Sequence, residues 1–100
     1  MKLKFEEIAY REYSIKGQKD RISVAIGKPQ KLPNSSDFFC PYKLTAFNKE
    51  DIRNIFGIDG FQAIHLAFKT IDAELRRIIQ KKSVELEWAG RSFSDLTFPE

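Results

Sequence analysis

Two side chains of this sequence could act together as a nucleophile and its base. Cys40 is the single cysteine and His65 the single histidine among 100 residues, and a thiol beside an imidazole is a common catalytic pair. Cys40 falls on the inward face of an expected strand, and His65 at the rim of an expected helix. A cysteine so placed is usually a small buried apolar residue, and such a histidine a hydrogen-bonded boundary residue. We therefore predict no catalytic residue and no enzyme.

Metal and phosphate chemistry have little support in the sequence. One Cys and one His cannot supply the soft ligands of a zinc or iron site, so we expect no metal and no cofactor. The turn from Gly57 to Gly60 precedes a helix, but it has neither the spacing nor the lysine of a P-loop. Asp59 in that turn places a negative charge where an anion would bind, which favours a role in starting the helix.

Basic charge near the end of the expected long helix is the best functional signal. Arg76, Arg77, Lys81 and Lys82 lie close together in the sequence, and Lys69 lies one helix face away. Such a cluster could bind phosphates or an acidic protein. The same side chains would also complement the negative end of the helix dipole. Both interpretations stay open at this point.

The polar segment 28–37 is a second candidate, because it is the longest irregular stretch and so a binding loop. Phe39 and Phe47 share the expected outward face of one strand, as an RNA-binding sheet would require. Leu66 and Ala73, on the outward helix face, would serve equally for protein contact. The candidate partner-binding residues are Lys28, Lys31, Lys69, Arg76, Arg77, Lys81 and Lys82.

Composition excludes several classes of protein. Apolar residues make up 42% of the chain, and 17 basic against 14 acidic residues leave a net charge of only +3. This excludes a disordered, collagen-like or disulfide-stapled chain. The lone cysteine fits a reducing compartment, and no apolar run is long enough for a signal peptide or a membrane span. We expect a cytoplasmic protein with no membrane contact.

Three strands are expected in the first half of the chain, over residues 5–15, 21–26 and 38–47. In the first strand, Ile8 and Tyr10 have the opposite parity to Tyr13 and Ile15, so we expect a bulge or two partly covered faces. The polar residues 16–20 form a hairpin loop. Pro41 cannot donate to a ladder and belongs at an edge, a bulge or a strand start.

Helical spacing governs the next segment. Ile52, Ile55 and Phe56 follow the i, i+3, i+4 pattern, so a short helix is expected over residues 49–56, capped by Asn48 and ended by Gly57. A long helix follows from residue 60 to about 81, with Asp59 and Gln62 as a capping box. Its expected core stripe contains eight residues: Phe61, Ile64, Ala67, Phe68, Ile71, Leu75, Ile78 and Ile79.

A last strand is expected around residues 84–88, followed by a turn at Ala89-Gly90. Phe93, Leu96 and Phe98 form an apolar tail that packs back on the domain. The order is β-β-β-(short α)-α-β, which predicts a single α+β domain over residues 1–100. We expect a mostly antiparallel sheet of about four strands with one long helix packed on one face.

Three stretches of the chain resemble a family of short bacterial proteins known only as a domain of unknown function. They are Ile26-Gly27-Lys28-Pro29, then residues 37–42 (DFFCPY), then residues 56–64 (FGIDGFQAI). The resemblance covers about the middle half of the chain and implies a stand-alone bacterial cytoplasmic domain. It carries no known activity or site, so no functional residue is transferred.

The sequence therefore predicts a non-enzymatic protein-binding domain. One concrete form is an immunity-type protein that neutralises a toxin, with its contacts on the outer helix face and in the segment 28–37. The small positive charge suits an acidic partner. The alternative is weak nucleic-acid binding through the basic end of the long helix. A homodimer through the outer sheet face or an edge strand is also compatible with the pattern.

Overall fold

The strands of the described chain belong to one antiparallel sheet. The computed structural model describes residues 5–93. The elements are β1 (Glu7–Ile15), β2 (Arg21–Gly27), β3 (Gln30–Lys31), β4 (Phe38–Ala46), β5 (Lys49–Gly57), α1 (Gly60–Lys82), β6 (Leu86–Trp88) and β7 (Arg91–Ser92). The strands are ordered β3-β4-β2-β1-β6-β7, and β5 also pairs with β4. The α+β class is confirmed, with seven strands in place of about four.

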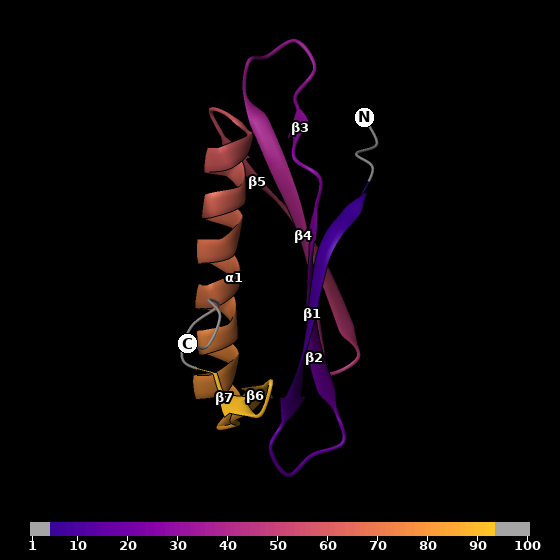
Figure 1. Ribbon diagram of the computed structural model, residues 1–100, viewed down its shortest axis with the longest axis vertical. Coiled ribbons are helices and arrows are strands. Elements are labelled where there is room, and N and C mark those ends of the chain that lie inside the picture. Colours follow the sequence, from indigo (N-terminus) through magenta and orange to yellow (C-terminus); the bar gives the residue numbers. More distant parts are fainter. Residues whose placement is uncertain (1–4, 94–100) are drawn as a thin grey trace.

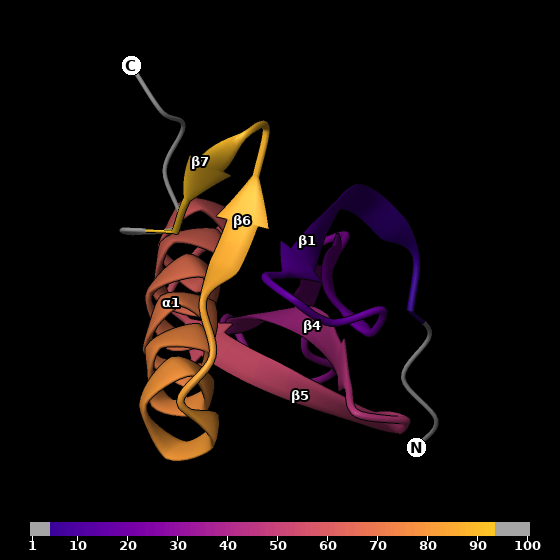
Figure 2. The ribbon, with the colours of Figure 1, turned by 90° about the horizontal axis from the view of Figure 1, so that it is seen from below.

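The long helix lies along one side of the sheet. Figure 1 shows α1 running beside β4 and β5, and Figure 2 shows it to one side of β1, β4 and β5. It packs most closely on β4 and β5. The predicted single helix on one face of an antiparallel sheet is therefore confirmed.

The irregularities expected in the first strands are present. The register between β1 and β2 shifts between Glu7 and Ala9, so the predicted bulge lies there. Beyond it, Tyr13 and Ile15 are buried. One edge of β4 is shared by β2, which pairs with Tyr42–Thr45, and β3, which pairs with Phe38–Phe39. Pro41 lies at this change of partner, where a missing N–H is tolerated.

The short helix expected over residues 49–56 is wrong, because this segment is β5. It pairs with β4 without interruption from Ala46↔Lys49 to Phe38↔Gly57. Phe47 and Asn48 have φ values of 50° and 64°, which makes them the two-residue turn of a hairpin. Asn48 is thus a turn residue and not a helix cap.

The start of α1 is capped as predicted. Asp59 accepts a hydrogen bond on Oδ1 from the backbone N–H of Gln62 at 2.8 Å. The Gln62 side chain in turn accepts through Oε1 from the backbone N–H of Ile58 at 2.8 Å. The helix ends at Ser83, which has a left-handed backbone.

The predicted core stripe of α1 is partly wrong. The buried helix residues are Ala63, Ala67, Ile71 and Leu75, a line about 40° around the helix from the centre of the predicted stripe. Phe61 is 88% exposed and Phe68 44% exposed. The reason is a close approach at the start of α1, because a Cβ on Gly57 would lie 2.6 Å from the Ala63 nitrogen. Only small side chains fit on that side.

The core has two parts along α1. The larger cluster surrounds the second half of the helix and contains Tyr13, Ile15, Ile22, Val24, Tyr42, Leu44, Ala46, Ile71, Leu75 and Leu86. The smaller cluster lies under the first half and contains Ile26, Cys40, Ala63 and Ala67. The second half of α1 is therefore anchored by large side chains, and the first half by small ones.

The last described segment, residues 86–93, packs against the larger of the two core clusters. Ala89 and Gly90 have φ values of 54° and 75° and connect β6 to β7, as predicted. The ring of Phe93 meets that of Tyr13 edge-on, with centroids 5.7 Å apart. Leu96 and Phe98 of the expected tail lie outside the described residues. Within residues 5–93, no helix has the length and apolar content to cross a membrane.

Candidate functional site

The seven predicted partner-binding residues are spread along the length of the molecule. A Cβ on Gly60 would lie 3.7 Å from the Cβ of Pro29, so Lys28 and Lys31 are near the start of α1. Lys81 and Lys82 are in its last turn. A helix of 23 residues is about 33 Å long. The structure therefore does not bring the seven residues together.

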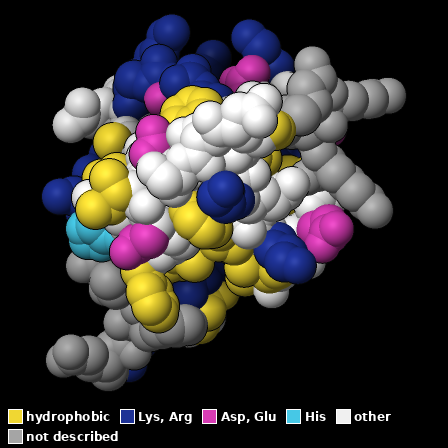
Figure 3. All heavy atoms as spheres, turned by 90° about the horizontal axis from the view of Figure 1, so that it is seen from above, with side chains coloured by type: hydrophobic (Ala, Val, Ile, Leu, Met, Phe, Trp, Pro, Cys, Tyr) yellow, Lys and Arg dark blue, Asp and Glu magenta, His cyan; other side chains and the backbone are white. Residues whose placement is uncertain are grey.

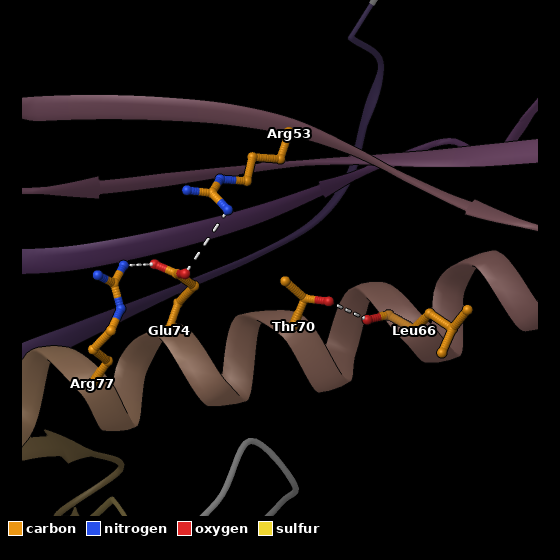
Figure 4. A network of polar contacts seen from close by, with 5 residues as sticks. All are labelled: Arg53, Leu66, Thr70, Glu74 and Arg77. Atoms are coloured by element: carbon orange, nitrogen blue, oxygen red, sulfur yellow. Dashed lines mark hydrogen bonds and ion pairs between the residues drawn. The ribbon is translucent and has the colours of Figure 1, made fainter.

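Arg76 and Arg77, at the helix end, are both engaged in ion pairs. Arg76 Nε lies 2.8 Å from Asp72 Oδ2, one helical turn away. Arg77 donates to Glu74 Oε2 at 2.5 Å. Glu74 also faces Arg53 of β5, with 4.0 Å between its Oε1 and the guanidinium (Figure 4). Much of the positive charge at this end is thus neutralised within the molecule.

Of the two lysines at the same end, Lys82 contacts an aromatic ring, and Lys81 makes no ion pair with a described residue. Lys82 Nζ lies 5.3 Å from the centroid of the Phe47 ring, in the turn between β4 and β5. Lys81 makes no ion pair with any residue from 5 to 93. The contact between Lys82 and Phe47 ties the helix end to the hairpin turn.

A buried tyrosine lies beside the Arg53–Glu74–Arg77 network. Tyr42 is 1% exposed and pairs across the strands with Arg53. Its hydroxyl has no hydrogen-bond partner among the described residues, and burial raises the pKa of the phenol. Tyr42 has the same parity on the strand as Cys40, so alternation places it inward, but alternation does not show which groups lie around its hydroxyl.

Cys40 and His65 do not form a reactive pair. Cys40 is fully buried, and its thiol donates to the carbonyl of Gly27 at 3.5 Å. Burial raises its pKa to about 11, so the thiol stays protonated at neutral pH. His65 is exposed on α1. In the described part of the chain, no three His, Cys, Asp or Glu residues are grouped to hold a metal ion.

The aromatic platform expected on the outer face of β4 is wrong. Phe39 is only 1% exposed, because its ring packs against that of Phe56, 6.4 Å away between centroids. Lys43 lies over the ring of Phe5 at 4.7 Å. Phe47 is half-buried in the hairpin turn. These rings are therefore not the open stacking surface that an RNA-binding sheet presents.

Large apolar side chains are exposed at the start of α1 instead. Ile58 is 72% exposed, Phe61 88% and Phe68 44%. Phe61 and Phe68 are two helical turns apart and so share one flank of α1. Figure 3, which views this end of the molecule from above, shows hydrophobic side chains at the surface among charged ones. The sequence analysis missed this group because it assigned both phenylalanines to the core.

Three of the predicted lysines border these apolar side chains. Lys69 follows Phe68 on α1, and Lys28 precedes Pro29, which adjoins Gly60. Lys31 pairs with Phe38, which pairs with Gly57, so Lys31 is two strands, or about 10 Å, from the end of β5. We define the helix-start surface as Ile58, Phe61, Phe68, Lys28, Lys31 and Lys69. It unites segment 28–37 with the helix flank, while the other four predicted residues lie at the far end.

The fold and this surface define a small α+β domain with a basic, apolar patch at the start of its one long helix. The chain belongs to the family described as a domain of unknown function (DUF6968), whose model matches residues 9–100. No curated protein and no solved structure matches the chain. Gly27 and Gly57, from the stretches that carried the predicted resemblance, leave no room for a Cβ, which would lie 2.7 Å from Pro41 Cγ or 2.6 Å from the Ala63 nitrogen.

Proposed function

We propose that this protein is a non-enzymatic binding domain of bacterial type that holds an acidic protein against the helix-start surface. The observation that carries the proposal is the exposure of Phe61, at 88%, beside Ile58 at 72%. Exposure of two large apolar side chains three residues apart is unfavourable in water, and covering them with a partner lowers the free energy. Aromatic side chains, phenylalanine included, are also enriched at the cores of protein interfaces.

Charge around the surface indicates the chemistry of the partner. Lys28, Lys31 and Lys69 are exposed and make no ion pair with another described residue. Asp59 is next to Ile58 in the sequence, but its carboxylate is used as the helix cap. Unpaired lysines around an apolar centre favour a partner with an acidic rim. An immunity-type protein that covers an acidic face of a toxin is one form of this proposal.

Nucleic-acid binding by the helix end remains the alternative, with less support. Arg76 and Arg77 already pair with Asp72 and Glu74, so a phosphate would have to displace a carboxylate from each. Binding of this kind would weaken steeply as salt is raised. A fluorescence titration with single-stranded and duplex oligonucleotides at low salt tests it directly.

Site-specific crosslinking in the native host tests the proposal. A photo-reactive phenylalanine analogue replaces Phe61 in one version of the full chain, and Tyr10 in the control. Tyr10 is an exposed aromatic residue, at 56%, but lies on β1. We expect one acidic protein to crosslink at position 61 and not at position 10.

Binding measurements then complete the test. The purified partner should bind Phe61→Ser at least about 30-fold more weakly than the unaltered chain, and Tyr10→Ser with unchanged affinity. Equal crosslinking at the two positions, or equal affinities of the two variants, would contradict the proposal.

A further inference from the structure

Among the strands of residues 5–93, β5 has the longest open edge. β5 has nine residues and pairs with β4 along its whole length, and no other described strand pairs with it. The two-residue turn at Phe47-Asn48 makes Ala46 and Lys49 a hydrogen-bonded pair. Alternation then directs the backbone N–H and C=O groups of every second residue to the free edge. These residues are Glu50, Ile52, Asn54 and Phe56.

This edge has charged side chains but no other usual protection against pairing. Natural edge strands are commonly short, carry charged side chains, or contain a proline or a bulge. β3 and β7 have two residues each. β5 has no proline, and its register with β4 has no shift. Ile52 and Phe56, on the side away from α1, are 55% and 54% exposed.

We propose that β5 pairs antiparallel with β5 of a second copy of this chain, about a twofold axis at Ile52. Ile52 then lies opposite Ile52, and Glu50 opposite Asn54. These are the residues whose backbone groups point to the edge, so both pairs are hydrogen-bonded across the interface. Asp51 lies opposite Arg53 on each side of the axis, in the closer, non-hydrogen-bonded positions.

The charged side chains of β5 favour the register centred on Ile52 over the registers centred on Asp51 or Arg53. Centred on Asp51, the pairing would place Asp51 against Asp51 and Lys49 against Arg53. Centred on Arg53, it would place two arginines in contact. Only the register centred on Ile52 gives two Asp51–Arg53 pairs. Arg53 is also 4.0 Å from Glu74, and its five donors allow it to bind both carboxylates.

The same axis brings the two helices together. A twofold axis perpendicular to the joined sheet leaves both copies of α1 on one face. Because α1 packs on β4 and β5, and strands are about 4.8 Å apart, the helix axes would be about 10 Å apart, close to the usual spacing of packed helices. The helix contact adds to the area buried by the strand edges. This inference uses a surface separate from the helix-start surface and does not rest on the proposed function.

Charge exchange across the axis tests the pairing. Sedimentation equilibrium of the full chain should give a concentration-dependent dimer. Asp51→Arg should weaken it about tenfold or more, because each pair becomes repulsive, and Asp51→Arg with Arg53→Asp should restore it. Asp20→Arg, the same change in the exposed β1–β2 loop, is the matched control and should leave the dimer unchanged. Circular dichroism confirms that each variant is folded.

Amide hydrogen exchange supplies a second measurement on the unaltered chain. Raising the protein concentration should slow exchange at Glu50, Ile52 and Asn54, whose N–H groups point to the edge. Exchange at Asp51 and Arg53, which bond to β4, should not change. A monomer at all concentrations, a dimer insensitive to Asp51→Arg, or a folded double variant that does not dimerise would each overturn the proposal.

Discussion

The two halves of α1 meet the sheet through different side chains. The second half contributes Ile71 and Leu75 to a cluster that also holds two buried tyrosines, and its outer arginines are ion-paired. The first half contributes Ala63 and Ala67 as its buried residues to a small cluster, with Ile64 partly buried against it, and leaves Phe61 exposed. Large apolar side chains therefore stabilise the fold at one end and remain available to a partner at the other.

This difference shows that an apolar residue on an amphipathic helix can have either of two roles, in the core or on an exposed surface. Leu75 and Phe61 both belong to the stripe that periodicity predicts, yet Leu75 is fully buried and Phe61 is 88% exposed. The close approach of Gly57 to Ala63 turns the first half so that its small residues face the sheet. Four predictions test the contrast, from the largest expected effect to the smallest.

Leu75→Ala should cost the most. Leu75 has no exposed surface and lies in the larger cluster, and truncation of such a leucine costs about 2–5 kcal/mol of unfolding free energy. Urea unfolding followed by circular dichroism measures it. Phe68→Ala, at a side chain that is 44% exposed, should cost less than half as much. Equal losses at the two positions would remove the distinction between the halves.

Gly57→Ala should follow, with a loss of about 1–3 kcal/mol. The added Cβ would lie 2.6 Å from the Ala63 nitrogen and 3.0 Å from its Cα, so backbone must move. Gly60→Ala is the matched control, because its Cβ meets only Pro29, at an ordinary 3.7 Å. We expect that control to be neutral or slightly stabilising, since alanine favours a helix. A tolerated Gly57→Ala would contradict the close approach that exposes Phe61.

Asp59→Ala should cost about 1 kcal/mol through loss of the helix cap. The carboxylate accepts from the backbone N–H of Gln62 at 2.8 Å. Asp59→Asn keeps an acceptor at the same place and should retain most of the stability. Thermal unfolding of the two variants measures the difference. If Asp59→Asn lost as much stability as Asp59→Ala, the charge of Asp59 and not its hydrogen bond would stabilise the helix start.

Local signals in the sequence were sufficient for much of the fold. The cap at Asp59, the length of α1, the bulge in β1 and the turn at Ala89-Gly90 each depend on a few neighbouring residues, and all are present. The burial of Cys40 also follows from alternation along β4. Interactions between neighbouring residues determine each of these features, and no tertiary contact changes them.

The prediction for residues 49–56 was wrong because the spacing of their apolar residues fits both a helix and a strand. Ile52, Ile55 and Phe56 satisfy the spacing of a helix face, yet in β5 Ile55 packs inward while Ile52 and Phe56 are exposed. The hairpin turn that would have revealed β5 contains Phe47, an unusual residue at positive φ. Its ring packs beside the larger cluster, a tertiary contact that no local rule contains.

The lysines of the candidate site were predicted from their charge, whereas its apolar residues were identified from their exposure in the structure. The sequence correctly marked Lys28, Lys31 and Lys69 as surface residues, but it gave equal weight to the arginines that Asp72 and Glu74 neutralise. It also placed Phe61 in the core. Which flank of α1 faces the sheet depends on the contact between Gly57 and Ala63, which periodicity alone cannot supply.

The free energy of unfolding of Phe61→Ser tests the central claim most directly. Phenylalanine and serine have similar helix propensities, so the substitution reports mainly on burial. Since the side chain is 88% exposed, the account predicts urea unfolding within about 0.5 kcal/mol of the unaltered chain. A loss of about 3 kcal/mol or more, the cost of removing a phenylalanine from a core, would show that Phe61 holds the fold together and is not free for a partner.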